Sequence, residues 1–250
     1  MFTAEFAIRP FLVAHTDLAL DHLARWVEDP DPHVRRLVSE GTRPRLPWGG
    51  NLRAFQADPA PGLRLLERLK DDPSEYVCRS VANHLNDIAK DHPAIALTVC
   101  ERWSRDAGPE RRWIVRHGLR ALMKQGDRRA LGLLGYDDKA RVTAGALTVT
   151  PGSVVLGGAI DFSLDLVSTG AGTQKLLVDY AIHHRKANGA TTPKVFRLKT
   201  LDLAPGATVR LAKRHPLKPI TTRRYHPGTH EVEVILNGRA VARAAFELAV

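Results

Sequence analysis

The 250-residue sequence predicts a multidomain α plus β protein, in which a helical array precedes an antiparallel β-sandwich. Residues 1–141 carry apolar side chains at helical spacing. Residues 142–250 carry short alternating runs separated by Gly, Pro and Asn, which is typical of strands. A motif also recurs within the helical part at a spacing of about 40 residues.

Helix start signals divide the first part into segments. Thr16 is a suitable cap for one helix and Ser74 for another. Proline stands near several other starts, where its fixed φ and missing N–H are tolerated. The predicted helices cover residues 16–26, 61–70, 74–89, 93–104 and 109–125.

The recurring motif changes the interpretation of these helices. Asp29-Pro-Asp-Pro-His-Val-Arg-Arg aligns with Asp72-Pro-Ser-Glu-Tyr-Val-Cys-Arg at an offset of 43 residues. Glu110-Arg-Arg-Trp-Ile-Val-Arg is a weaker third copy, offset by a further 37 residues. This spacing predicts a HEAT-like or armadillo-like solenoid, an α-α superhelix. The copies place these residues in register: Val34, Val77 and Ile114, and Arg36, Arg79 and Arg116.

The arginines in register predict a ladder along one face of the solenoid. Such a ladder suits a polyanionic partner. The alternative is that each arginine pairs with an acidic residue of a neighbouring repeat.

The second part has the pattern of an immunoglobulin-like sandwich, with about seven short strands over about 100 residues. Asn237-Gly238 is its strongest hairpin signal, because a type I′ turn needs positive φ at both central residues. The predicted strands cover residues 144–150, 159–168, 175–186, 194–200, 208–213, 229–236 and 239–248.

Charge follows the same division. The sequence has 37 Lys and Arg against 27 Asp and Glu, a net charge of +10. Residues 142–250 contribute 14 basic and 7 acidic residues, and Asp202 is the only acid between Arg185 and Arg224. A balance this basic indicates a nucleic-acid partner, with the sandwich contacting phosphates. The alternative is a basic protein whose solvated cationic face binds nothing anionic.

Other classes of protein are disfavoured. No apolar run approaches the ~18 residues of a membrane-spanning helix, and no secretory signal begins the chain. Cys78 and Cys100 form no CxxC pair, and the histidines form no HExxH motif. We therefore expect a cytoplasmic protein with no metal and no cofactor.

Three stretches go beyond generic repeat patterning. Ser39-Glu-Gly-Thr-Arg-Pro-Arg-Leu-Pro-Trp is a polar helix exit, and Trp113-Ile-Val-Arg-His-Gly-Leu-Arg joins an indole to basic residues. The helix after Ser74 places five polar side chains within eight positions: Asn83, His84, Asn86, Asp87 and Lys90.

Together these motifs resemble the AlkC branch of the HEAT-like-repeat alkylpurine DNA glycosylases, the AlkC/AlkD superfamily, which also carry a C-terminal immunoglobulin-like domain. The resemblance implies base excision repair, in which the N-glycosidic bond of cationic alkylated bases such as N3-methyladenine is hydrolysed in duplex DNA. It implies that no base is flipped into a pocket, unlike the usual glycosylase strategy. It also implies an enzyme that is nucleoid-associated when bound to DNA. Members of the family begin upstream of the position that matches Met1, so this sequence is expected to be short at its N-terminus.

The resemblance also implies site residues. Carboxylates stabilise the oxocarbenium-like sugar and position water, and we assign these catalytic roles to Glu40, Glu75 and Asp87. The alternatives are that Glu75 complements a helix dipole and that Asp87 is a salt-bridge partner. Trp103 is expected in the core. The candidate DNA-binding residues are Arg43, Arg45, Trp48, Arg79, Asn83, Asn86, Lys90, Arg112, Trp113, Arg116 and His117.

Two other functions remain as alternatives. One is a non-catalytic DNA-binding module, although carboxylates on its binding face would repel the backbone. The other is a protein-interaction scaffold, the commonest use of HEAT arrays, which predicts apolar exposed helices rather than an arginine ladder. We predict domains at residues 1–141 and 142–250, a monomer, and double-stranded DNA as the partner.

Overall fold

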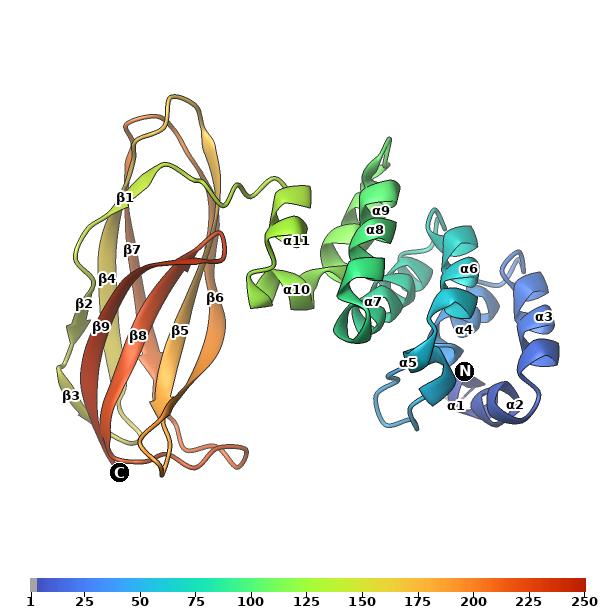
Figure 1. The fold of residues 1–250 in the computed structure, drawn as a ribbon, viewed down its shortest axis with the longest axis horizontal. Helices are drawn as coiled ribbons and strands as arrows, with labels where there is room; N and C mark the ends of the chain where they lie inside the picture. The colour runs from blue at the N-terminus through green and yellow to red at the C-terminus, as the bar shows by residue number, and fades with distance from the viewer. Residues whose placement is uncertain (1–3) are drawn as a thin grey trace. The chain divides into compact units, whose positions relative to one another are not determined.

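The computed structural model describes residues 4–250, which divide into two compact units, residues 4–125 and 126–250 (Figure 1). Each unit has its own secondary structure, helical in the first and mainly strands in the second. Within the described chain, no helix is long and apolar enough to cross a membrane.

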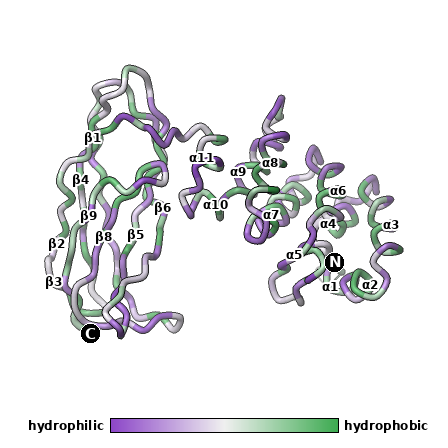
Figure 2. Tube along the Cα trace, viewed as in Figure 1, coloured by the Kyte–Doolittle hydropathy of each residue, from purple (hydrophilic) through white to green (hydrophobic). Residues whose placement is uncertain are grey.

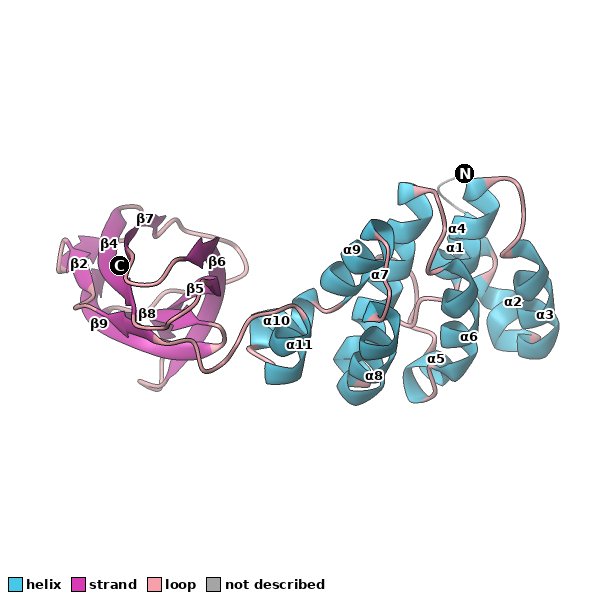
Figure 3. Ribbon diagram, turned by 90° about the horizontal axis from the view of Figure 1, so that it is seen from above, coloured by secondary structure: helices cyan, strands magenta, loops and turns pink. Residues whose placement is uncertain are grey.

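The first unit is a right-to-left succession of helix pairs in Figure 1, as the predicted α-α superhelix requires. Helices α1, α4, α7 and α9 form one layer, and α3, α6 and α8 form a second layer along the lower side of the unit in Figure 3. The bounds are α1 Ala4–Ala7, α2 Arg9–Ala14, α3 Thr16–Trp26, α4 Pro32–Gly41, α5 Arg53–Ala57, α6 Ala60–Leu69, α7 Glu75–Asp91, α8 Pro93–Ser104, α9 Pro109–Gly118 and α10 Arg120–Gln125.

The helix predicted over 109–125 is interrupted in the structure. It divides into α9 and α10 at Leu119. A Cβ on Gly118 would lie 2.8 Å from Cδ2 of Leu85, so the glycine allows α9 to pack closely on α7. Spacing of apolar residues did not reveal this break, because the break depends on a neighbouring helix.

The repeat register corresponds to the core of this unit. Val77 and Ile114 are fully buried, while Val34 is half-buried. Trp103 is also buried, as expected, and its indole N–H donates to Glu67. Burial of these side chains between successive helix pairs is what stabilises a solenoid.

The second unit is a two-sheet sandwich, in agreement with the predicted immunoglobulin-like fold. In the described chain one sheet has the order β1-β4-β2 with β7 also on β4, and the other has the order β3-β9-β8-β5-β6. The bounds are β1 Val142–Ala144, β2 Thr148–Thr150, β3 Ser153–Val155, β4 Ala159–Ser168, β5 Gln174–Arg185, β6 Thr191–Leu203, β7 Thr208–Pro216, β8 Gly228–Leu236 and β9 Arg239–Ala249.

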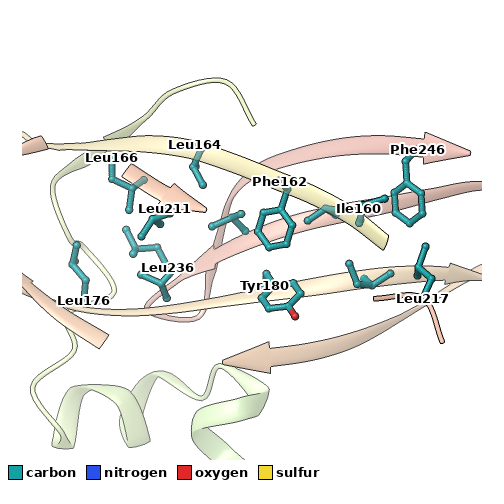
Figure 4. Close-up of a cluster of buried hydrophobic side chains, with 14 of the residues drawn as sticks. Ile160, Phe162, Leu164, Leu166, Leu176, Tyr180, Leu211, Leu217, Leu236 and Phe246 are labelled. Carbon is teal, nitrogen blue, oxygen red and sulfur yellow. The ribbon is translucent and has the colours of Figure 1, made fainter. Parts of the chain in front are cut away.

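The core of the sandwich lies between the two sheets (Figure 4). Along β4, Ile160, Phe162, Leu164 and Leu166 are buried and the residues between them face outward. Polar and apolar segments alternate accordingly along the chain trace in Figure 2. The strand predicted over 144–150 is instead two strands, β1 and β2, and the short strand β3 was not predicted.

A short helix precedes the strands and packs against them. Helix α11, Arg128–Leu133, lies in the second unit, before the predicted boundary at residue 142. The Asn237-Gly238 turn has φ of 46° and 80°, as a type I′ hairpin requires. Asn237 Nδ2 donates to the carbonyl of Asp137 at 2.7 Å, and its Oδ1 accepts from the Leu177 N–H at 2.7 Å. The hairpin therefore fastens the segment that follows α11 to the sheet.

Candidate functional site

Three sets of residues, one on and after α4, one on α7 and one on α9 and α10, recur at alternating spacings of three and four, which places each set on one side. Contacts between the sets show that they share one surface. We call it the charged face; it consists of Arg36, Glu40 and Arg43 on and after α4, Tyr76, Ser80, Asn83, Asp87 and Lys90 on α7, and Trp113, His117 and Arg120 on α9 and α10.

Both carboxylate oxygens of Glu40, on the charged face, accept hydrogen bonds. Its side chain is buried, and Oε1 accepts a hydrogen bond from Arg43 at 2.6 Å while Oε2 accepts one from the Ser80 hydroxyl at 2.6 Å. An ionised carboxyl has about four lone-pair positions. These two bonds fix the orientation of Glu40 and leave acceptor capacity for another group.

Asp87 lies deeper, with 1% of its surface exposed. Its Oδ2 accepts from Arg43 Nε at 2.8 Å, and its Oδ1 accepts from Lys90 at 2.9 Å. Arg43 therefore bridges Asp87 and Glu40. The salt-bridge interpretation of Asp87 is correct as a description of its contacts.

Glu5 is a carboxylate of this region that the sequence analysis missed. It is buried, and its Oε1 lies 3.5 Å from Arg36 Nη1. Nη2 of the same arginine lies 3.8 Å from Glu40, and its guanidinium sits 4.7 Å from the ring centre of Tyr76. Arg36 thus brings two carboxylates together. Nothing in the sequence marked Glu5, because α1 has only four residues and lies outside the repeated motif.

Trp48 projects from the loop that follows α4. It is fully exposed and has φ of 59°, which is strained for a bulky residue. Arg9 anchors the loop by donating from Nη1 to the carbonyls of Gly41 and Arg43, at 2.9 and 2.8 Å, and from Nη2 to that of Gly50. Backbone strain that surrounding contacts maintain is a feature of functional sites.

The loop has a second anchor. Arg45 donates to both oxygens of Asp91, at 2.9 and 2.6 Å, and this pairing lowers the pKa of Asp91. Burial, with Arg43 nearby, lowers the pKa of Arg9. Both arginines therefore serve the loop that presents Trp48.

The other side of the charged face is aromatic and cationic. The Trp113 and His117 rings stack with centroids 4.8 Å apart and an 8° angle between planes. Burial, then the charges of Arg120 and Arg79, lower the pKa of His117. Its ring is therefore neutral at pH 7, and the stacked pair presents an uncharged surface between cations.

Several predicted site residues lie apart from this network. Glu75 is exposed and pairs with exposed Arg79 at 2.5 Å. Asn86 is buried, and its Oδ1 accepts from the backbone of Ala121 at 3.2 Å, which is a structural contact. Arg112 donates to the carbonyl of Ala107 and remains exposed, as does Arg116.

The predicted arginine ladder is largely paired with acids. Arg36 lies between Glu5 and Glu40, and Arg79 bonds Glu75. Between residues 4 and 250, no three His, Cys, Asp or Glu side chains are grouped to hold a metal ion. Burial raises the pKa of Cys78 to about 11 and that of Cys100 to about 12, so neither thiol is suited to nucleophilic chemistry.

One end of the sandwich is strongly basic. We call it the basic end; it consists of Arg185, Lys194, Lys213 and Arg223, which surround three buried histidines. Burial is the main cause that lowers the pKa of His184 to about 3 and that of His215 to about 4. The positive charges of the basic end lower the pKa of these histidines and of His230 further. In the part of the chain that the structure describes, no carboxylate pairs with a residue of the basic end.

Comparison with known proteins places this chain beside a family model, a protein of known sequence and a solved structure. The family model for the C-terminal Ig-like domain of the uncharacterised protein YhaZ matches residues 143–250. The uncharacterised protein YhaZ of Bacillus subtilis (strain 168) is 39% identical over 246 residues, which are 98% of this chain and 68% of that protein.

The third match is a solved structure of the alkylpurine DNA glycosylase AlkC of Pseudomonas fluorescens, bound to DNA that contains an abasic-site analogue. It is 46% identical with a TM-score of 0.94, over 98% of this chain and 68% of that one.

Proposed function

The chain belongs to the family that contains AlkC and YhaZ, and we propose that it is a DNA glycosylase that removes alkylated bases from duplex DNA. The similarity to AlkC, whose solved structure holds DNA, carries this proposal. The charged face supports it, because its fixed carboxylates and cations suit a reaction in which positive charge develops beside a polyanion.

We assign cationic bases such as N3-methyladenine as the substrate. A base that already carries a positive charge is a good leaving group, and cleavage of its N-glycosidic bond leaves the charge on the sugar. A carboxylate held in place next to that sugar stabilises the developing oxocarbenium ion without reorganising. A carboxylate also accepts a proton from the attacking water.

Glu40 has the contacts that these roles require. Arg43 and Ser80 hold its two oxygens, and its free acceptor positions remain available to the sugar or to water. Glu5, on the other side of Arg36, is a second carboxylate of the same region. We assign to Asp87 a positioning role, because it acts on Glu40 through Arg43. Glu75 is a carboxylate at the exposed rim, where it orients Arg79.

The exposed side chains of the helical unit are the candidates for direct contact with DNA. Trp48 and Trp113 offer aromatic surfaces to a sugar or base, and exposed arginines such as Arg116 offer phosphate contacts. In the helical unit, cavities of about 430 and 380 Å³ lie against α6 and are not lined by residues of the charged face. The basic end of the sandwich supplies further phosphate contacts.

Base release from methylated duplex DNA tests the proposal, with the freed base identified by mass spectrometry. We expect the wild type to release 3-methyladenine or a related cationic purine. Glu40→Gln keeps the shape of the side chain and one of its two acceptor oxygens but removes its charge, and it is expected to slow release by about 10²- to 10³-fold. The matched control is Glu28→Gln, since Glu28 is exposed and pairs with Arg68 away from the charged face.

Binding of undamaged duplex separates the alternatives. Glu40→Gln is expected to bind it as well as the wild type does. Loss of release and of binding together would indicate misfolding. A wild type that binds duplex tightly and releases no base would be a non-catalytic DNA-binding module.

A further inference from the structure

Most arginines around the charged face are neutralised by carboxylates. Each pairing is a direct contact within the helical unit, and together they include the buried carboxylates Glu5, Glu40 and Asp87. The paired arginines are Arg36 with Glu5 and Glu40, Arg43 with Glu40 and Asp87, Arg45 with Asp91, and Arg79 with Glu75.

Arg120 is different. It is half-buried at the start of α10, and its guanidinium bonds only to uncharged acceptors. Nη1 donates to the carbonyl of His117 at 2.7 Å, and Nη2 donates to Oδ1 of Asn83 at 3.0 Å. Among residues 4–250 no carboxylate forms an ion pair with it, although its side chain carries five N–H donors and only two are used.

This arrangement leaves a partly desolvated cation without compensation. Burial and the charge of Arg43 both lower the pKa of Arg120, and only Asp87 opposes them. Asp87 cannot serve as its partner, because its two oxygens already accept from Arg43 and Lys90. An unpaired charge in such surroundings destabilises the free protein, and a bound anion would relieve it.

We propose that Arg120 is a phosphate-binding residue of the charged face, oriented by Asn83 to bond a phosphodiester of the duplex DNA backbone. This inference rests on the proposed function and names a contact that supports it. The planar guanidinium fork matches two phosphate oxygens, and the bonds from Asn83 and His117 fix the plane of the fork before DNA arrives.

A phosphate-binding role has a consequence that a structural role would not have. Removing the unpaired charge weakens DNA binding and at the same time stabilises the free protein. Replacing a structural arginine would instead lower both the affinity for DNA and the stability of the free protein. The variants are Arg120→Met, which keeps the aliphatic stem, and Arg120→Lys, which keeps the charge without the fork. Arg64→Met is the matched control, because Arg64 is an exposed arginine of α6 without an ion pair in the described chain.

The experiment measures affinity for undamaged duplex across a salt series, with thermal unfolding of the free full-length protein. For Arg120→Met we expect roughly tenfold weaker binding and a salt slope reduced by about 0.9, the value for one phosphate contact. Its melting temperature should equal or exceed that of the wild type. Arg120→Lys should keep the salt slope and lose affinity, and Arg64→Met should change neither by a comparable amount.

Three results would overturn the proposal. One is an unchanged salt slope in Arg120→Met, and another is a lower melting temperature accompanied by weaker binding. The third uses inorganic phosphate alone: if it raises the melting temperature of the wild type only, while both proteins bind duplex equally, the ligand is free phosphate.

Asn83→Ala supplies an independent check, since it keeps the charge but releases the guanidinium. We expect weaker binding with an unchanged salt slope; unchanged affinity would remove the positioning role of Asn83. Base release decides the proposed function separately. A wild type that binds duplex through Arg120 but releases no base would contradict the glycosylase assignment and leave the phosphate contact standing.

Discussion

The charged face of the helical unit and the basic end of the sandwich differ in how their cations are paired. On the charged face of the helical unit, Arg36 and Arg43 are bonded to buried carboxylates at fixed distances. At the basic end of the sandwich, Arg185 and Lys213 are exposed and have no carboxylate partner in the described chain. Paired charges in a partly dry site fix geometry, whereas unpaired surface charges attract a polyanion at long range. The difference suggests that chemistry belongs to the first unit and much of the affinity to the second.

The largest expected effect comes from the basic end. Replacing Arg185, Lys194, Lys213 and Arg223 together by Met or Gln should weaken duplex binding on the order of 10³-fold, with a salt slope lower by about 0.9 for each phosphate that is no longer neutralised. The measurement is affinity for undamaged duplex between low and physiological salt. An unchanged slope would mean that the sandwich neutralises no phosphates, and the comparison between the units would fail.

Replacing an arginine that pairs with buried carboxylates should lower the stability of the helical unit. Arg43→Met leaves Glu40 and Asp87 without their shared partner, so we expect the free energy of unfolding to fall by about 3–4 kcal/mol. All four tryptophans, at positions 26, 48, 103 and 113, lie in the helical unit, so tryptophan fluorescence in urea follows this unit alone. The control Arg64→Met should stay within about 0.5 kcal/mol of the wild type.

Acid should destabilise the sandwich through its buried histidines. Burial lowers the pKa of His184 to about 3 and of His215 to about 4, below the ordinary value of 6.5. The unfolded chain therefore binds more protons between pH 6.5 and these values, and stability is lost as the pH falls through that window. We expect a loss on the order of 2 kcal/mol per histidine at pH 5, measured by hydrogen exchange of the strands.

A variant isolates one of these histidines. Neither ring nitrogen of His184 has a hydrogen-bond partner. His184→Leu should therefore reduce the acid sensitivity of the strands without lowering their stability at pH 7. Identical pH profiles for the variant and the wild type would exclude His184 as a source.

A smaller effect is expected at the hairpin that holds α11. Asn237→Ala removes the acceptor of the Leu177 N–H and the donor to Asp137, and it places alanine at φ of 46°. We expect a loss of about 1–2 kcal/mol in the unfolding free energy of the sandwich. Asn188→Ala is the matched control, because Asn188 lies in an exposed hairpin where it accepts only from Ala190. Equal losses in both variants would show that the α11 attachment adds nothing.

The sequence was enough to predict those helices, strands and turns that are determined by their own residues. The helices predicted at 16–26 and 93–104 match α3 and α8, and the strand predicted at 159–168 matches β4. The type I′ turn at Asn237-Gly238 was also correct, since its geometry depends on those two residues. Elements that depend on distant partners were missed: β3 is defined by its parallel pairing with β9, and α9 ends where Gly118 meets Leu85.

The site was predictable to a similar degree. The polar motifs correctly drew attention to Glu40, Arg43 and Asp87, which the structure joins in one network. The sequence did not show which carboxylates belong to the network, because Glu40 and Glu75 differ mainly in burial, which sequence spacing does not show. Arg120 was not among the predicted site residues, since an unpaired charge is a property of surroundings rather than of spacing.

The attachment of α11 bears on how such a protein is assembled from parts. The Asn237 side chain holds the segment after α11, and the Asn237-Gly238 turn packs against Gly126, so the structural module begins near residue 126 although its first strand begins at Val142. A graft of the sandwich onto another helical array would need to carry this adaptor helix with it. A junction placed at the first strand would expose the underside of the hairpin and remove one of the two carbonyl acceptors of the Asn237 amide. The domain that can be transferred between proteins is therefore the sandwich together with helix α11.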